Sequence, residues 1–176
     1  MSTRPAFLLI DAQVNMFDPA SPVNDSAALL ERLRSLLERA RAAGAPVFLV
    51  RNTGGEGDPD VPGTPGWELH PSLAPRAGER VLDKTTCDTF ASTPLGSELV
   101  ALGVTSVVIA GLQSEWCIRE STLGALAAGH AVTLVSDGHS TYDGKTRTAA
   151  ETSAAVNAEL AARVALVAAD QVAFGG

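Results

Sequence analysis

Residues 105–129 read TSVVIAGLQSEWCIRESTLGALAAG, and this segment decides the fold that the sequence predicts. The β-branched run at 107–109 has the length and composition of a buried strand. The run breaks at Gly111, and a helical pattern follows with Cys117 at or near its first turn. The free N–H groups of a helix N-terminus lower the pKa of a thiol and can hold an oxyanion. The segment resembles a nucleophile elbow, and a small buried cysteine at a helix start is the competing interpretation.

Length and composition favour one domain spanning residues 1–176, long enough for a substantial core. The 20 acidic and 13 basic residues give a formal charge of −7, which argues against a nucleic-acid or anionic-membrane partner. The apolar stretch near the N-terminus is too short for a secretory signal, and no window is long enough for a membrane span. Two cysteines form no disulfide framework, so we expect a cytoplasmic protein.

The rest of the chain alternates apolar runs with helical patterns. Leucines at helical spacing between residues 29 and 40, followed by Gly44, predict an amphipathic helix. Further helices are expected from Pro94 to Gly103, after the elbow as far as Gly129, and over 148–163. The expected strands cover 6–10, 47–50, 81–82, 107–109, 131–135 and 164–167. This order predicts an α/β fold, a three-layer αβα sandwich with a six-stranded, mostly parallel sheet.

Residues 52–80 interrupt the pattern with five prolines and six glycines. A loop of this length inside a compact domain is usually functional or disordered. Trp67 and Leu69 predict that its second half packs against the body of the domain. The sequence leaves open whether the loop closes over its own site or a neighbouring one.

Three polar side chains are expected to meet at one edge of this sheet. Ligands of open α/β sheets bind beyond the carboxyl ends of the strands, where Asp11, Lys84 and Cys117 follow three apolar runs. The carboxylate can act as general base toward the thiol and as general acid toward a leaving amine. The ammonium is expected to lower the pKa of the thiol and to keep the carboxylate ionised. Asp11 and Lys84 taken singly are each better explained as strand-end structure, but the coincidence of the three residues favours a catalytic site.

The residues around this trio match a known family. LLIDAQVNMF at 8–17, VLDKTTCDTF at 81–90 and VVIAGLQSEWCIRESTLGALAAG at 107–129 resemble the isochorismatase-like cysteine hydrolases. That superfamily includes nicotinamidases, N-carbamoylsarcosine amidohydrolase and streptothricin hydrolases. The resemblance runs from about residue 6 to about residue 143 and includes the accessory residues Gln13 and Asp137.

The resemblance implies a catalytic triad of Asp11, Lys84 and Cys117. It also implies a cis, non-proline peptide bond between Leu112 and Gln113, with the N–H groups of Gln113 and Cys117 forming an oxyanion hole. By the same analogy the protein is expected to be a homodimer or homotetramer with the isochorismatase-like, Rossmann-like hydrolase fold.

Departures from the family pattern reduce the number of substrates that the resemblance allows. Nicotinamidases carry an Asp-x-His metal box after the second strand, where this chain has Arg51, Asn52 and Thr53, and the three histidines have no ligand spacing. We therefore expect no metal and no cofactor, and nicotinamide is disfavoured. Isochorismatases proper lack the cysteine, so Cys117 also disfavours isochorismate. The segments at 113–117 and 136–143 look closest to streptothricin-hydrolase-like proteins.

Aromatic residues close to the triad in sequence are candidates for the substrate pocket. We expect Phe17, Trp67, Phe90 and Trp116 to contribute an aromatic wall, which would favour a flat or apolar acyl group, and His139 to line the pocket. The second cysteine, Cys87, lacks the strand–turn–helix context and is predicted to be a packing residue.

These observations predict a metal-independent cysteine hydrolase that cleaves a small amide, carbamoyl or lactam C–N bond through a thioester. Its expected partner is a small-molecule substrate. The alternative is a redox-sensing or non-catalytic protein that uses Cys117 as a reactive thiol on the same fold. A nucleotide-binding module is disfavoured because no G-x-G-x-x-G run follows the first strand.

Overall fold

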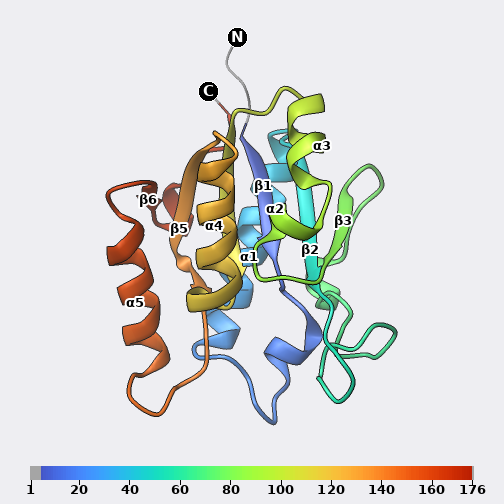
Figure 1. The fold of residues 1–176 in the computed structure, drawn as a ribbon, viewed down its shortest axis with the longest axis vertical. Helices are drawn as coiled ribbons and strands as arrows, with labels where there is room; N and C mark the ends of the chain where they lie inside the picture. Colours follow the sequence, from blue (N-terminus) through green and yellow to red (C-terminus); the bar gives the residue numbers. More distant parts are fainter. Residues whose placement is uncertain (1–4, 176) are drawn as a thin grey trace.

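A six-stranded parallel sheet forms the centre of the structure, with strand order β3-β2-β1-β4-β5-β6 (Figure 1). The computed structural model describes residues 5–175, so the ends of the predicted 1–176 domain lie outside the described residues. The strands are β1 (Ala6–Ile10), β2 (Val47–Asn52), β3 (Arg80–Lys84), β4 (Ser106–Leu112), β5 (Ala131–Ser140) and β6 (Ala165–Val167). Each neighbouring pair is parallel, which confirms the predicted α/β fold class.

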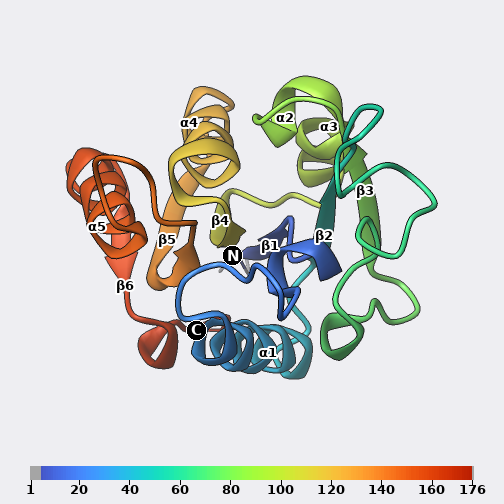
Figure 2. The same ribbon diagram turned by 90° about the horizontal axis from the view of Figure 1, so that it is seen from below.

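Helices cover both faces of the sheet, as Figure 2 shows from below. The α-helices are α1 (Ser26–Ala42), α2 (Thr89–Ser92), α3 (Leu95–Ala101), α4 (Arg119–Ala127) and α5 (Ala149–Leu160). Helix α1 packs on one face, and the other helices lie on the opposite face (Figure 2). Short turns of helix cover Val14–Phe17, Pro71–Leu73, Ser114–Ile118 and Ala169–Gln171. None of the helices in the described range is long and apolar enough to cross a membrane.

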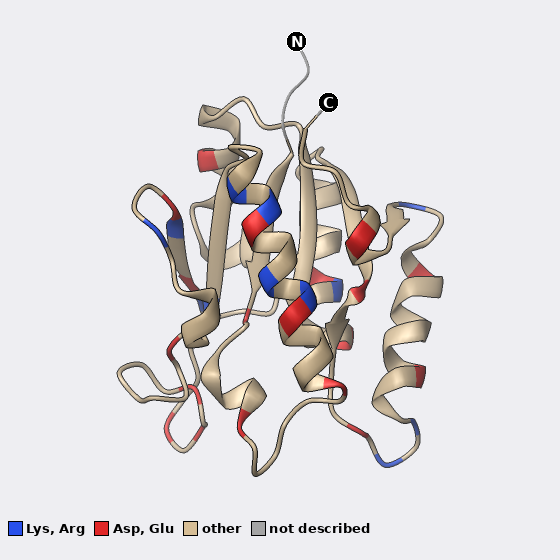
Figure 3. Cartoon of the chain, turned by 180° about the vertical axis from the view of Figure 1, so that it is seen from behind, with Lys and Arg blue, Asp and Glu red and all other residues tan. Residues whose placement is uncertain are grey.

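The central strands are buried on both faces, which explains their unbroken apolar runs. In β1, Phe7 and Leu9 belong to the core under α1, whereas Leu8 and Ile10 face the core under the other helices. The predicted leucine stripe of α1 is buried in the core between α1 and the sheet. The same helix carries both basic and acidic residues (Figure 3), none of which belongs to its buried stripe. The amphipathic helix expected from the leucine spacing is therefore confirmed.

Several elements differ from the sequence-based boundaries: β2, β3 and β4 are each longer than expected, and the short helix α2 was not expected. Strand β5 was expected to end at residue 135 but continues to Ser140, because a register shift lets it rejoin β4 beyond Ile109. Leu134 pairs with Ile109, and His139 pairs with Gly111, so β5 bulges between these two points. Helix α5 ends at Leu160 rather than at residue 163.

Gly111 is required where β4 passes closest to β1. Its φ of +132° is a conformation that L-residues rarely adopt, and a Cβ at this position would overlap the carbonyl oxygen of Ile10. The glycine therefore allows the two strands to pair immediately before the turn that carries Cys117.

We expect Gly111→Ala to lower the free energy of unfolding by about 3 kcal/mol, because it adds both backbone strain and a clash with β1. Gly103→Ala is the matched control: Gly103 also has a positive φ, of 66°, but a Cβ there would meet nothing within 4 Å. That control is expected to cost about 1 kcal/mol. Urea denaturation of the two variants measures the difference, and equal losses would contradict the role assigned to the close strand contact.

Candidate active site

The candidate site lies where the strand order reverses direction. Strands β1 and β4 are neighbours, but the chain winds outward from them in opposite directions, which makes the gap beyond their carboxyl ends the topological switch point. Asp11 follows β1, Lys84 ends β3, and Cys117 follows β4 after one turn. The structure brings these three predicted residues together.

Lys84 contacts both other members of the predicted trio. Its side chain is 0% exposed, and its Nζ lies 2.9 Å from Asp11 Oδ2, 3.0 Å from Asn52 Oδ1 and 3.1 Å from Cys117 Sγ. The amide oxygen of Asn52 and the sulfur of Cys117 accept hydrogen bonds from the ammonium, and Asp11 pairs with it as an ion pair. A buried lysine with these three polar neighbours is a positioned charge rather than a solvated strand end.

Asp11 is held in a backbone conformation that suits few residues. Its φ is +52°, in the left-handed region, and its N–H donates to the carbonyl oxygen of Val50 at 2.9 Å. The carboxylate is 1% exposed and pairs ionically with Lys84, but neither oxygen has a hydrogen-bond partner of good geometry among the described residues. The carboxylate therefore retains lone pairs that can accept a proton.

Cys117 lies in a π-helical turn, Ser114–Ile118, that runs directly into α4. The thiol is largely buried, with 9% exposure. The peptide bond between Leu112 and Gln113, at the start of this turn, is cis. The strand, turn and helix expected from the sequence are thus all present, with the cysteine one short turn before the α-helix.

The electrostatics of the resting site differ from the expectation that Lys84 lowers the pKa of the thiol. Burial raises the pKa of Cys117, the Asp11 carboxylate raises it further, and the ammonium of Lys84 only partly opposes them. Burial likewise raises the pKa of Asp11 despite the ion pair. Burial alone would lower the pKa of Lys84, but Asp11 and Cys117 together keep that pKa raised. At rest the site therefore holds a neutral thiol beside an ion pair.

A second layer of polar groups fixes the lysine. Asn52, at the end of β2, accepts from Lys84 and donates through Nδ2 to Asp60 Oδ2 at 2.7 Å. The side chain of the fully buried Gln13 accepts a hydrogen bond from the N–H of Asn52 and donates one to its carbonyl oxygen. It also donates to the carbonyl oxygen of Trp67. Sequence reasoning recorded Asn52 only as the residue replacing a metal box, and it missed Asp60, which carries no local signal in its loop.

A cavity of about 320 Å³ opens beside the triad. Its lining combines triad members with residues of the long loop: Asp11, Asn15, Met16, Asn52, Asp58, Pro59, Asp60, Cys87, Gln113, Trp116 and Cys117. The loop at 52–80 therefore reaches over the site of its own chain. Cys87 contributes to the cavity as well as packing against the core, so the packing interpretation describes only part of its surroundings.

The predicted aromatic wall is wrong for three of its four members. Phe17 packs edge-on against His70, with ring centroids 5.3 Å apart. Trp67 lies under the guanidinium of Arg51. Phe90 packs beside His130 against the core on the face of the sheet opposite α1. Only Trp116 lines the cavity, with 58% of its surface exposed. Proximity in sequence to a triad member did not determine the direction of these rings.

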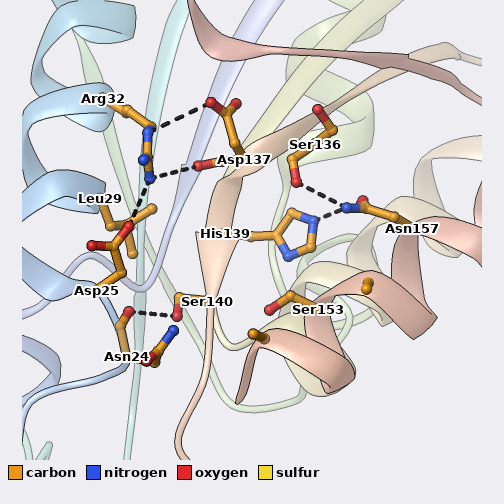
Figure 4. Close-up of a pocket in the computed structure, with 12 residues that line it drawn as sticks. Asn24, Asp25, Leu29, Arg32, Ser136, Asp137, His139, Ser140, Ser153 and Asn157 are labelled. Carbon is orange, nitrogen blue, oxygen red and sulfur yellow. Dashed lines mark hydrogen bonds and ion pairs between the residues drawn. The ribbon is translucent and has the colours of Figure 1, made fainter. Parts of the chain in front are cut away.

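His139 is also outside the catalytic cavity. Because β5 continues past residue 135, His139 lies within the strand and lines a different cavity between α1, β5 and α5 (Figure 4). Its ring nitrogens face Ser114 and Asn157, at 2.8 and 2.9 Å. The expectation that His139 lines the substrate pocket is therefore wrong.

The polar groups of the cavity beside Cys117 are mainly acceptors. The carboxylate of Asp60 is 6% exposed, and the Asn52 amide is the one side chain among residues 5–175 that hydrogen-bonds to it; Asp58 lies nearby in the same loop. The Oδ1 atom of Asn15 is buried without a partner. Lys, Arg and His are absent from the described residues that line the cavity. Within residues 5–175, no three His, Cys, Asp or Glu side chains are grouped so that they could hold a metal ion.

Comparison with known proteins adds a family context to this geometry. The model of the isochorismatase domain matches residues 5–168. Two streptothricin hydrolases of Streptomyces noursei are 45% identical over 138 residues, which cover 78% of this chain but only 50% and 55% of theirs. The chain thus spans about half the length of these relatives.

Two further matches cover more of the compared protein. A maleamate amidohydrolase of Pseudomonas putida is 30% identical over 154 residues, covering 76% of this chain and 71% of that protein. A solved structure from Oleispira antarctica superposes with a TM-score of 0.91 at 30% identity, covering 97% of this chain and 96% of the other.

The negative charge of the cavity predicts how Cys117 reacts with charged thiol reagents. Cationic 2-aminoethyl methanethiosulfonate should modify Cys117 about tenfold faster than the anionic 2-sulfonatoethyl reagent, after both rates are divided by those of 2-mercaptoethanol. Asp60→Asn should reduce this ratio, whereas Asp83→Asn, outside the cavity, should not. Peptide mass spectrometry separates Cys117 from Cys87, and a ratio near one would contradict the assigned charge.

The raised pKa of Cys117 predicts the pH dependence of its alkylation. Because only the thiolate reacts, the iodoacetamide rate should still be rising at pH 9, the ordinary pKa of the group. Asp11→Asn removes a negative neighbour and should shift the profile to lower pH, while Lys84→Met should shift it to higher pH. A wild-type rate that reaches its plateau below pH 8 would be incompatible with a neutral resting thiol.

Proposed function

This chain belongs to the isochorismatase family, and from that membership we propose that it hydrolyses the C–N bond of a small amide, carbamoyl or lactam substrate. The observation that carries the proposal is the single buried ammonium of Lys84 within 3.1 Å of both Cys117 and Asp11. The names of the streptothricin hydrolases and the maleamate amidohydrolase support the same reaction class.

The first half-reaction forms a thioester. The Cys117 thiol gives its proton to Asp11 as Sγ attacks the carbonyl carbon, so the thiolate never has to accumulate in the buried site. The C–O electron pair moves onto oxygen, where the backbone N–H groups of Gln113 and Cys117 act as an oxyanion hole. The C–N bond then breaks, and the proton on Asp11 passes to the departing nitrogen.

The second half-reaction returns the enzyme to its resting state. Asp11, again ionised, takes a proton from water as the water oxygen attacks the thioester carbonyl. Collapse of the intermediate breaks the S–C bond, and the proton returns to Cys117 as the acid is released. Lys84 remains an ammonium throughout and balances the negative charge that alternates between Asp11 and Cys117. The carboxylate suits this exchange because burial raises its pKa toward that of its proton partners.

The redox alternative has less support from the site. A sensing thiol reacts as an exposed thiolate, whereas burial and Asp11 raise the pKa of Cys117. Asp11 has no task in a sensor, because a sensor needs only a cationic neighbour. A homodimer or homotetramer stays part of the proposal by analogy with the family.

We expect Cys117→Ala to abolish hydrolysis and Asp11→Asn to lower kcat by at least about 100-fold, since both proton transfers depend on that carboxylate. The assay uses small amides, carbamoyl compounds and lactams, with streptothricin and maleamate included. Intact-mass spectrometry should find the acyl adduct on wild type but not on Cys117→Ala. Asp83→Asn is the matched control and should retain full activity, because Asp83 is an exposed carboxylate that precedes Lys84 in the sequence.

Hydrolysis by the Cys117→Ala variant of a compound that the wild type also hydrolyses would overturn the covalent mechanism. Hydrolysis of none of these compounds by the wild-type protein would overturn the proposed reaction class.

A further inference from the structure

The turn that carries Cys117 is anchored by a buried hydroxyl that the proposed chemistry does not use. Ser114 is 0% exposed and is the first residue of the π-helical turn, directly after Gln113. Its Oγ lies 2.8 Å from His139 Nδ1 on β5 and 2.8 Å from Ser153 Oγ on α5. One hydroxyl thus ties the turn to a strand and to a helix that are distant in the sequence.

The hydrogen-bond network determines the tautomer of His139. Asn157 donates through Nδ2 to the carbonyl oxygen of Ser136 at 2.8 Å, which leaves its Oδ1 as an acceptor facing His139 Nε2 at 2.9 Å (Figure 4). Nε2 therefore carries the proton, and Nδ1 accepts from the Ser114 hydroxyl. Ser114 Oγ is then free to accept from Ser153. Burial lowers the pKa of His139, which is consistent with this neutral ring.

The strand register brings this imidazole to the turn. His139 pairs with Gly111 and Ser140 with Leu112, so β5 runs alongside the last two residues of β4. The bulge in β5 is what places position 139 there, because an undistorted strand would put an earlier residue beside Gly111. A buried network of this kind is costly unless every member is satisfied, and each polar atom that carries it has a partner.

We propose that His139 is a positioning residue that, through Ser114, keeps the N–H groups of Gln113 and Cys117 directed at the oxyanion. The inference rests on the oxyanion role given to these groups in the proposed function. His139 itself touches neither substrate cavity nor triad, since it lines the separate cavity of about 320 Å³ between α1, β5 and α5. Its action is therefore on geometry, not on proton transfer.

Two substitutions separate the two hydrogen bonds of the imidazole. His139→Asn places an amide oxygen near the position of Nδ1 and keeps the bond to Ser114, whereas His139→Gln reaches toward Asn157 and loses that bond. Ser114→Ala removes the same bond from the other side. Comparing these variants isolates the contact with the turn from the volume of the side chain.

The readout is reversible addition of propionaldehyde to Cys117, which needs no turnover. The sulfur bonds to the carbonyl carbon and the thiol proton moves to the carbonyl oxygen, which then lies against the oxyanion donors. The aldehyde affinity is measured as protection of Cys117 from iodoacetamide. The iodoacetamide rate without aldehyde is the internal control, because displacement of iodide forms no tetrahedral centre whose oxygen would lie against these N–H groups.

We expect His139→Gln and Ser114→Ala to weaken aldehyde binding about tenfold while the iodoacetamide rate stays within about twofold of wild type. His139→Asn should stay within about threefold in both. In His139→Ala, added imidazole should restore aldehyde binding, since the adjoining cavity gives it a path to the vacated position. The kcat for any substrate found should follow the aldehyde affinity, with little change in KM.

Unchanged aldehyde affinity in His139→Gln and Ser114→Ala would overturn the proposal. So would a parallel loss of aldehyde affinity, iodoacetamide rate and thermal stability, which is the result of a purely structural role. If the wild-type protein hydrolyses no compound but the aldehyde results hold, the reaction class is wrong and the positioning role stands.

Discussion

The buried ammonium of Lys84 is the interaction on which the rest of the site depends. Removing a charge from water costs several kcal/mol, and only close, well-directed partners offset that cost. Asp11, Asn52 and Cys117 supply those partners from β1, β2 and the turn after β4. The same ammonium that requires these partners also holds them together, so the thiol and the carboxylate are positioned by one charge.

The sheet makes this convergence possible. All six strands are parallel, so their carboxyl ends lie at the same edge of the sheet, and the pairing register fixes the heights at which their last residues lie. Gly111 lets β4 approach β1 closely enough for the turn to begin beside Asp11. The rigid apolar strands thus determine where the polar side chains meet, and the loops determine what surrounds them.

The surroundings of the three residues are buried and negatively charged. Burial raises the pKa of the Cys117 thiol and also that of Asp11, which remains paired with Lys84. Loop residues Asp58 and Asp60 add negative charge without a compensating cation among the described residues of the lining. This charge distinguishes the cavity from one built to hold an anionic substrate.

Sequence alone determined the fold class and the three central residues, because both depend on local patterns. Apolar runs of strand length alternating with helical periodicity leave few arrangements, and polar residues at strand ends must gather at one edge of a parallel sheet. Asp11, Lys84 and Cys117 were therefore recognisable before their contacts were known. The same reasoning singled out the loop at 52–80 as functional or disordered, but it could not determine which of its side chains turn inward.

Tertiary structure alone decided the pocket and the electrostatics. Three of the expected pocket aromatics pack outside the cavity: Phe17 against His70, Trp67 against Arg51, and Phe90 against the core opposite α1. The direction of each ring depends on packing among elements that are distant in the sequence. The bulge in β5, which the sequence did not predict, places His139 beside Gly111 and outside the cavity next to Cys117. The raised pKa of Cys117 likewise follows from burial, a property of the assembled fold, which outweighs the effect of the lysine beside it.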